Sequence, residues 1–291
     1  MTRPLLETLV HPDSSFLAYI READEFPFEW HYHPEYELVA ILKGEGERFV
    51  GDHLDIYHAG DLVMTGPNLP HTWRSKDIVP ASKAVVIQFG RNFLGEAFFT
   101  APELAGVRLL LKASHHGLAF HGTVRRQALL LIDALLKAEG FPRLLKLLAL
   151  LDLLAKAGSQ QDHLSSRLFD EIPTSAERTR FEEAFSEIVR SYREPVWQSD
   201  VAKRLHMTPG TLSRLFKRHC GRGFTQCLIE YRVAIACRLL QETDLRVTEI
   251  SERCGFLNLS NFNRQFLKIK KRSPRAYRNQ WHRQEPRPPV A

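Results

Sequence analysis

A histidine-rich stretch near the N-terminus carries the side chains best suited to chemistry. The segment EWHYHPEYELVAILKG, residues 29–44, holds His31 and His33 two positions apart, and Glu37 follows at the same parity. Alternate side chains of a strand point to one face, so all three would point the same way in an extended segment. Such a set could bind a metal ion, hydrogen-bond a small ligand, or satisfy itself inside a packed domain.

A second segment, GDLVMTGPNLPHTW (residues 60–73), supplies His71 and Trp73 at one parity. The predicted ligand-binding set is His31, His33, Glu37, His71 and Trp73. The indole could stack on the apolar face of a sugar ring while the other groups hydrogen-bond its hydroxyls. Alternatively, a divalent transition metal could be held by His31, His33, Glu37 and His71, with positions left open for a ligand.

Short strands are the elements that must position these side chains. Residues 10–90 contain five apolar runs of strand length: SSFLAYI, YELVAIL, GERFVGD, GDLVMTG and KAVVIQF. Glycine and proline separate these runs at close intervals, as they do between strands joined by tight turns. The spacing favours a β-barrel or a sandwich over alternating βα units.

The first of the two segments also shows a family pattern. His33, three residues, Glu37, six residues and Gly44 match the first half of the cupin signature, and His31 stands two residues before it.

The second segment matches the other half of that signature by the ten residues between Gly60 and His71. Residues 15–90 therefore resemble a cupin domain, which implies a β-barrel that holds a metal or a small ligand. Gly66 and Ser75 depart from the pattern, because proline and asparagine are usual at these places.

Beyond about residue 100 the apolar residues follow a helical period. Residues 123–140 and 141–158 are two leucine-dense segments of helix length. The leucines of the second segment cover more than one helical face, so this helix must pack on two partners at once. We expect the barrel to be one partner and a second subunit to be the other, which gives a homodimer. A helical hairpin within one chain is the alternative.

Charge is distributed unevenly along the 291 residues. Residues 179–291 contain 22 Lys and Arg against 11 Asp and Glu, a net charge of +11, whereas residues 1–178 carry −5. Only the basic part is therefore expected to meet a polyanion, and double-stranded DNA is the favoured one. No apolar run has the length of a signal peptide or a membrane span, which predicts a soluble, cytoplasmic protein.

An internal repeat lies in the basic part. LSRLFKR from Leu212 and FNRQFLK from Phe262 align at a distance of 50 residues. Each copy has a short helix, a turn and a second helix, which is the helix-turn-helix spacing. Thr208 and Asn258 are well placed to cap the second helices.

Each second helix is predicted to have an apolar and a polar face. The inward residues are Leu212, Leu215, Phe216 and His219 in the first, and Leu259, Phe262, Phe266 and Ile269 in the second. Guanidinium, hydroxyl and amide groups suit base edges, and lysines suit phosphates. The predicted DNA-binding residues are Ser213, Arg214, Lys217, Ser260, Asn261, Arg264 and Lys268.

Residues 181–280 resemble the DNA-binding domain of AraC/XylS-family transcription regulators. The resemblance is carried by VAKRLHMTPGTLSRLFKRHCGRGF, EISERCGFLNLSNFNRQF and SPRAYR. It implies seven helices, two recognition helices in successive major-groove turns, and a rigid helix between them. Arg214 and Arg264 fall on the family's base-contacting positions, whereas Gly210 stands where some members have a larger side chain. Regulators of this type often use cupin barrels as sugar pockets without a metal.

The predicted fold class is α+β with two domains. The N-terminal domain, residues 1–160, is a cupin-like β-barrel with following helices that senses a ligand and dimerises. Residues 161–178 form a linker, and residues 179–280 form an all-α double helix-turn-helix domain. Residues 281–291 are a disordered tail.

The predicted function is transcription regulation in response to a small molecule such as a sugar, without enzymatic activity. Its partners are promoter DNA, the effector, a second copy of the chain and, for an activator, RNA polymerase. Two alternatives remain at this point. One is a metal-dependent cupin enzyme fused to a DNA-binding domain, and the other is a regulator controlled by a protein partner.

Overall fold

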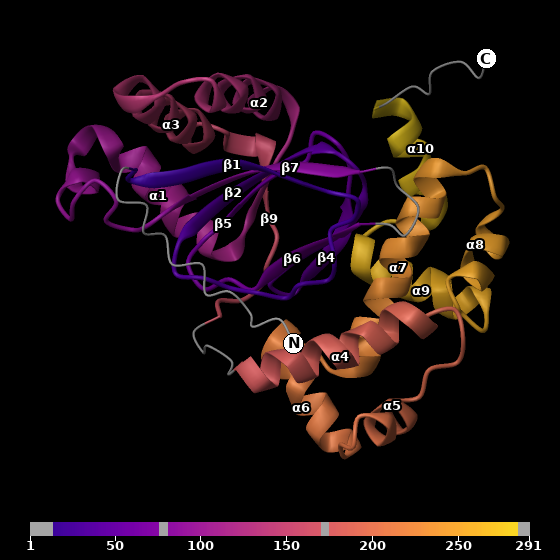
Figure 1. Ribbon diagram of the computed structural model, residues 1–291. Coiled ribbons are helices and arrows are strands. Elements are labelled where there is room, and N and C mark those ends of the chain that lie inside the picture. The colour runs from indigo at the N-terminus through magenta and orange to yellow at the C-terminus, as the bar shows by residue number, and fades with distance from the viewer. Residues whose placement is uncertain (1–13, 76–80, 170–174, 285–291) are drawn as a thin grey trace. The chain divides into compact units, whose positions relative to one another are not determined.

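The computed structural model describes residues 14–75, 81–169 and 175–284, with the side chains of a few further residues left undescribed. The chain forms two compact units, and the boundary between them along the main chain falls after Ser175 (Figure 1). No helix in the described ranges is both long and apolar enough to cross a membrane.

The N-terminal unit contains two antiparallel sheets. One has six strands in the order β1-β7-β2-β5-β8-β9, and the other has three in the order β4-β3-β6. The strands are β1 (Phe16–Ala23), β2 (Tyr36–Lys43), β3 (Gly46–Val50), β4 (His53–Tyr57), β5 (Leu62–Thr65), β6 (His71–Ser75), β7 (Ser82–Phe89), β8 (Leu118–Phe120) and β9 (Gln161–His163).

The predicted α+β class is confirmed, but the predicted barrel is not closed. Among the described residues the two sheets remain separate, so the N-terminal unit is a sandwich. The edge of β5 that does not face β2 is taken by β8, which comes from much later in the chain. Because this edge is already paired, it cannot close a ladder with the three-stranded sheet.

Side-chain alternation gives the six-stranded sheet two different faces. On β2, Leu38 and Ala40 belong to the core beneath the helices, whereas Val39 and Ile41 belong to the core between the sheets. The period of two along a strand produces this division. Glu37 has the parity of Val39, so its side chain faces the space between the sheets.

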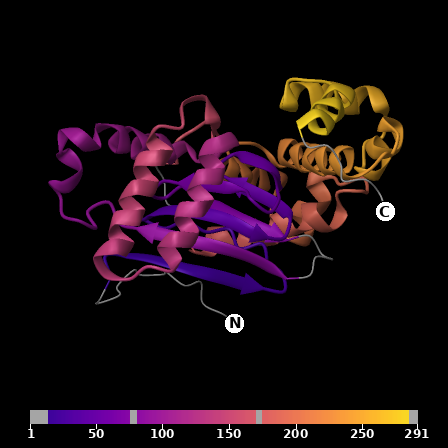
Figure 2. The same cartoon turned by 90° about the horizontal axis from the view of Figure 1, so that it is seen from above.

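Three helices accompany the six-stranded sheet: α1 (Ala105–Ala113), α2 (Gly122–Leu136) and α3 (Gly140–Ala155). Short 3-10 turns occur at Phe98–Thr100, Pro102–Leu104, Ser114–His116 and Gly158–Gln160. Helices α2 and α3 lie side by side across one face of the sheet (Figure 2). Leu147, Leu150, Leu151 and Leu154 of α3 are buried in the core that this packing forms.

The predicted linker, residues 161–178, differs from the structure at both ends. Residues 161–163 form β9 and pair with β8. Asp52 then accepts hydrogen bonds from the backbone of Ser166 at 2.8 Å and from the hydroxyl of Ser165 at 3.0 Å, which holds the following residues on the N-terminal unit. At the other end, α4 already begins at Ser175. The polar sequence of this segment has no periodicity, so its pairing with β8 and its hydrogen bonds to Asp52 could not be predicted from it.

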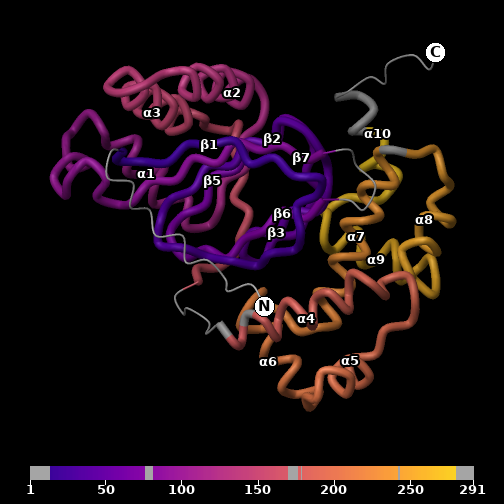
Figure 3. The backbone as a smooth tube through the Cα atoms, viewed as in Figure 1, coloured from indigo at the N-terminus to yellow at the C-terminus, as the bar shows by residue number. Residues whose placement is uncertain are grey.

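The C-terminal unit contains seven helices in its described residues, as the family resemblance implies. They are α4 (Ser175–Ser191), α5 (Gln198–Arg204), α6 (Pro209–Cys220), α7 (Phe224–Glu242), α8 (Val247–Arg253), α9 (Leu259–Lys270) and α10 (Pro274–Gln284). Helix α7 packs on α6, α8, α9 and α10 within this unit (Figure 3). The predicted disordered tail begins too early, because residues 281–284 continue α10, and residues 285–291 lie outside the described range.

Candidate metal centre and nucleic-acid interface

A row of polar side chains crosses the inner face of the six-stranded sheet. Glu37 on β2 lies opposite Thr65 on β5 and opposite Gln88 on β7. All three side chains are buried. Nε2 of Gln88 donates to Oε2 of Glu37 at 2.6 Å, which fixes the carboxylate in the space between the sheets.

Three histidines meet Glu37 from the opposite side. His71 begins β6, and an isolated antiparallel bridge pairs it with His31, with backbone hydrogen bonds of 2.9 and 3.2 Å. His33 follows two residues after His31 on the same side of the extended segment. One ligand atom from each of His31, His33, Glu37 and His71 can be chosen so that all four lie within 4.8 Å of one another.

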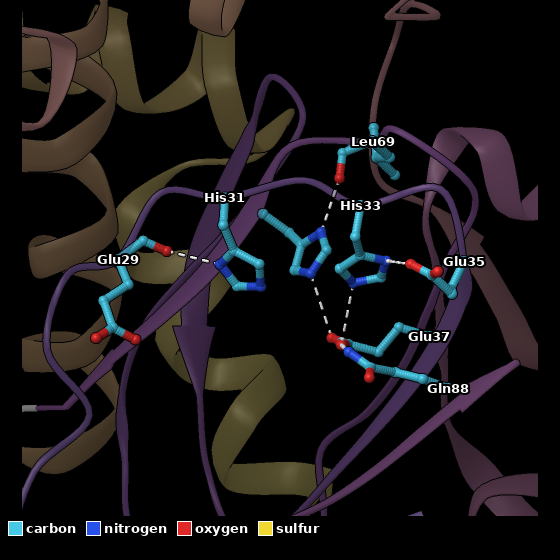
Figure 4. Close-up of polar contacts among 8 residues, drawn as sticks. Glu29, His31, His33, Glu35, Glu37, Leu69 and Gln88 are labelled. Atoms are coloured by element: carbon cyan, nitrogen blue, oxygen red, sulfur yellow. Dashed lines mark hydrogen bonds and ion pairs between the residues drawn. The ribbon is translucent and has the colours of Figure 1, made fainter. Parts of the chain in front are cut away.

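The outer nitrogens of these rings face protein oxygens (Figure 4). Nδ1 of His31 is 2.8 Å from the carbonyl oxygen of Glu29, and Nδ1 of His71 is 2.7 Å from that of Leu69. A carbonyl can only accept, so both Nδ1 atoms carry the proton and donate it. In the neutral form of each ring the lone pair is then on Nε2, whereas in the protonated form Nε2 carries a proton as well. Backbone or carboxylate acceptors orient metal-binding histidines in the same way.

Glu37 lies between the other two rings. Its Oε1 is 3.2 Å from Nε2 of His71, and its Oε2 is 3.2 Å from Nε2 of His33. Nε2 of His71 makes no hydrogen bond to any described residue in spite of this proximity. A buried imidazole lone pair beside a carboxylate is poorly satisfied by either group, whereas a cation between them would satisfy both.

The electrostatics of the cluster follow from burial and from its own charges. Burial, reinforced by His71, lowers the pKa of His31 to about 3. Burial also acts to lower the pKa of His33, but the carboxylates of Glu35 and Glu37 outweigh it and raise this pKa to about 10. Burial would raise the pKa of Glu37, yet the imidazoles of His71 and His33 hold it well below its usual value. Glu37 is therefore an ionised ligand at neutral pH.

Trp73 packs directly beside the histidine cluster. Its ring centroid is 5.7 Å from that of His71, at an interplanar angle of 70°. The side chain is 9% exposed and belongs to the core between the sheets. Its indole Nε1 is buried and has no hydrogen-bond partner in the part of the chain that the structure describes. The ring therefore presents a donor near the cluster, while its apolar body packs in the core.

These four residues fit a divalent transition metal, which would displace the proton that His33 otherwise carries at neutral pH. Three imidazoles and one carboxylate are ligands that zinc, iron, manganese and related ions accept. The fit rests on the short distances between the ligand atoms and on the two backbone-oriented rings. A bound ion would supply Lewis acidity and a place for an additional ligand atom, while the protein orients the donors and keeps bulk water away.

Sequence reasoning missed two residues that support this cluster. Oε2 of Glu35 is 3.3 Å from Nδ1 of His33, which completes the outward contacts of the three rings. The parity of Glu35 with His33 and Glu37 was a usable signal for it. Gln88 offered no comparable signal, because it reaches Glu37 only through the pairing of β2 with β7.

The first helix-turn-helix unit consists of α5 and α6. Thr208 is the N-cap of α6, as predicted, and accepts from the backbone of Thr211 at 3.1 Å, while Pro209 opens the helix. Arg214 and Lys217 are exposed and Ser213 is half-buried. On the opposite side Leu212, Phe216 and His219 are buried, whereas Leu215 is half-buried.

The second unit consists of α8 and α9 and repeats this arrangement. Asn258 caps α9, accepting from the backbone of Asn261 at 2.7 Å. Ser260, Arg264 and Lys268 are exposed and Asn261 is half-buried, while Phe262 and Phe266 are fully buried.

The predicted inward position of Leu259 is wrong, because this side chain is 37% exposed. Leu259 is the first residue of α9, and the turn before it leaves Leu257 exposed as well. Helical periodicity within α9 could not reveal where its first turn lies relative to α8. The exposed surface of α9 therefore begins with an apolar residue.

Comparison with known proteins assigns both units. Residues 201–280 match the family model described as a helix-turn-helix domain, and residues 20–87 match the model described as a cupin domain. An uncharacterised HTH-type transcriptional regulator, YijO of Escherichia coli K12, is 32% identical over 123 residues, which are 42% of this chain and 44% of YijO.

Two further similarities are also to transcription regulators. The HTH-type transcriptional activator RhaS of Pectobacterium carotovorum is 29% identical over 40% of this chain and 42% of its own length. A transcriptional regulator with an AraC-type DNA-binding domain from Chromobacterium violaceum, a solved structure, is 26% identical, covers 39% of this chain and all of its own, and has a TM-score of 0.36. The chain spans less than half the length of these two curated relatives, YijO and RhaS.

The two matched domains define the class as a helix-turn-helix protein with a cupin domain. The chain carries an AraC-type helix-turn-helix domain and a cupin domain, and its relatives are helix-turn-helix transcription regulators, which confirms the predicted resemblance.

Proposed function

We propose that this protein regulates transcription by binding promoter DNA through α6 and α9, and that its cupin unit responds to a small molecule with the help of a bound divalent transition metal. The observation that carries the regulatory part is the repeated pair of capped helices with exposed basic residues at equivalent places. N-terminal residues of such helices contact base edges when the helix enters the major groove.

The charge of the C-terminal part supports the same conclusion. Its net charge of +11 favours association with a polyanion over association with an acidic or neutral partner surface. We assign Arg214 and Arg264 to base edges, and we assign Lys217 and Lys268 to phosphates, because a planar guanidinium can form two hydrogen bonds with guanine.

The metal part of the proposal rests on the compactness of the histidine cluster. A spread of 4.8 Å among four ligand atoms suits one ion, whereas a sugar ring needs a wider opening and an exposed aromatic face. Trp73 packs in the core and offers no such face. We therefore favour a metal-assisted sensor over direct sugar stacking.

The metal is tested by elemental analysis of the purified full chain and by titration of the metal-free protein with Co²⁺, whose absorption spectrum reports its ligands. One bound ion per chain with nitrogen and oxygen ligation is expected. His71→Ala should weaken binding strongly, and the matched control His163→Ala, at an exposed position of β9, should not. Stoichiometric binding that is indifferent to His71 would disprove this assignment.

A reporter gene under the regulator's own promoter tests the sensing role. His71→Ala should abolish the response to the effector while DNA binding by the C-terminal unit persists. A normal response in this variant would leave the cluster with a structural role only.

The same ligand set also admits a metal-dependent enzyme as a second candidate. A carboxylate and three histidines can hold a metal that activates oxygen or water. Oxygen consumption by the metal-loaded protein, measured with a panel of small organic acids and sugars, distinguishes the two. Turnover that disappears in His71→Ala would favour the enzyme.

A further inference from the structure

A cavity lies in the N-terminal unit, and none of the four candidate metal ligands lines it. Its volume is about 360 Å³, within the range of small-molecule pockets. The cavity is formed by the loop before β6, by the end of α1 with the turn that follows it, and by residues 168–169. Its walls include Pro67, Leu69, Leu109, Lys112, Leu168 and Phe169.

The chemistry of the lining is apolar with one cation. Leu109 is 68% exposed and Leu168 is exposed as well, so two leucines give the mouth of the cavity an apolar surface. Lys112 is exposed and has no ion-pair partner among the described residues. Burial lowers the pKa of His115, another residue of the lining, so this imidazole is neutral and adds no second charge. Leu109 and Lys112 are neighbours on one face of α1.

The loop that forms one wall of the cavity also supports the metal cluster from behind. The side chain of Leu69 lines the cavity, while its carbonyl oxygen accepts from Nδ1 of His71 at 2.7 Å. The backbone of Asn68 donates to the carbonyl oxygen of His33 at 2.8 Å. A molecule that displaced Leu69 would therefore move a histidine of the cluster.

Gly66 shows why this loop departs from the usual cupin pattern. A Cβ atom at Gly66 would lie 2.7 Å from the backbone nitrogen of His115, and the backbone of Gly66 donates to Ser114 at 2.7 Å. Only glycine allows this approach, and proline would also remove the donor. The departure thus serves to join the loop to the turn after α1, and the two together form the cavity.

We propose that this cavity binds a small organic carboxylate with an apolar body, whose carboxylate pairs with Lys112 and whose body packs on Leu69, Leu109 and Phe169. Complementarity selects this class: an apolar wall excludes a strongly hydrated ligand, and a single ammonium without an ion-pair partner among the described residues selects one negative charge. The proposal goes beyond the proposed function, because the cavity does not include a residue of the metal cluster. Either can therefore fail without the other.

Calorimetric titration of the full chain with octanoate, and separately with octan-1-ol, tests the charge and the apolar body independently. Octanoate should bind saturably at millimolar concentration or below. Lys112→Gln should weaken octanoate binding about tenfold and leave octan-1-ol unchanged, because only the charge-assisted contact is lost. Lys43→Gln, an exposed lysine on β2, is the matched control and should have no effect.

Two further variants test the location. Ala113→Phe should fill the cavity and abolish binding of both probes. Leu109→Asp, at an exposed position where folding is not at risk, should weaken octanoate far more than octan-1-ol. His71→Ala should still bind octanoate, which separates this site from the metal centre. Absence of saturable octanoate binding, or binding that is indifferent to both Lys112→Gln and Leu109→Asp, would overturn the proposal.

Discussion

Arg214 and Arg264 make the same local contact in the two helix-turn-helix units. Nη2 of Arg214 donates to the hydroxyl of Thr211 at 3.3 Å, and Nη2 of Arg264 donates to the side-chain oxygen of Asn261 at 2.9 Å. Each acceptor lies three residues before its arginine, on the same helical face. Both guanidinium groups are thus held toward the N-terminal end of an exposed helix, where a base edge would lie.

This equivalence predicts the effect of removing either arginine. Arg214→Ala and Arg264→Ala should each reduce the free energy of specific DNA binding by about 1–3 kcal/mol, with far less effect on random duplexes. Gel-shift titration on a selected operator and on a scrambled duplex measures both quantities. Arg126→Ala is the control, since this arginine makes the same kind of contact with Thr123 on α2. Equal losses on both duplexes would assign the arginines to the phosphate backbone.

The hydrogen bond from Gln88 predicts a role in holding the metal ligand. Gln88→Leu preserves the size of the side chain but removes the donor to Glu37, so metal affinity should fall about tenfold or more. Competition with a chromophoric chelator measures the affinity. Gln241→Leu, a buried glutamine of the C-terminal unit, should leave it unchanged. Unaltered affinity in Gln88→Leu would show that Glu37 is held well enough by its histidines.

Two glycines of the DNA-binding unit should respond to alanine with opposite signs. A Cβ at Gly210 meets nothing closer than 3.8 Å, so Gly210→Ala should raise the free energy of unfolding by about 0.5 kcal/mol through helix propensity. At Gly255, φ is +76° and a Cβ would lie 2.2 Å from the carbonyl oxygen of Tyr192. Gly255→Ala should therefore lower the free energy of unfolding by more than about 1 kcal/mol. Urea denaturation followed by circular dichroism checks both, and the same sign for both would contradict the reasoning.

The exposed apolar residues of α2 and α3 predict self-association. Leu130 of α2 and Phe141 and Leu145 of α3 remain exposed although their helices pack on the sheet. Burial of this surface by a second copy would remove it from water, so we expect the full chain to sediment as a dimer at micromolar concentration. Phe141→Ser with Leu145→Ser should shift it to a monomer. Leu42→Ser, at an exposed position of β2, is the control and should leave the dimer intact. A dimer that persists in the Phe141→Ser, Leu145→Ser variant would place the interface elsewhere.

Local sequence was sufficient for the features that depend on neighbouring residues. Thr208 and Asn258 could be assigned as caps because each side chain bonds a backbone group three residues later, and the 50-residue repeat placed Arg214 and Arg264 at equivalent positions. The spacing of His31, His33 and Glu37 also grouped these residues correctly, although only Glu37 lies in a strand and His31 forms an isolated bridge. For these features the distance along the chain is short, so the chemistry of the residues predicts the contact.

Tertiary structure alone decided the features that join distant segments. Gln88 reaches Glu37 from 51 residues away, and β8 and β9 complete the sheet from residues that lack a strand pattern of their own. The open sandwich, the exposure of Leu259 and the cavity beside Lys112 have the same origin. Strand register and the packing of one element on another depend on which edges and faces remain free once the rest of the unit has folded, and no local periodicity contains that information.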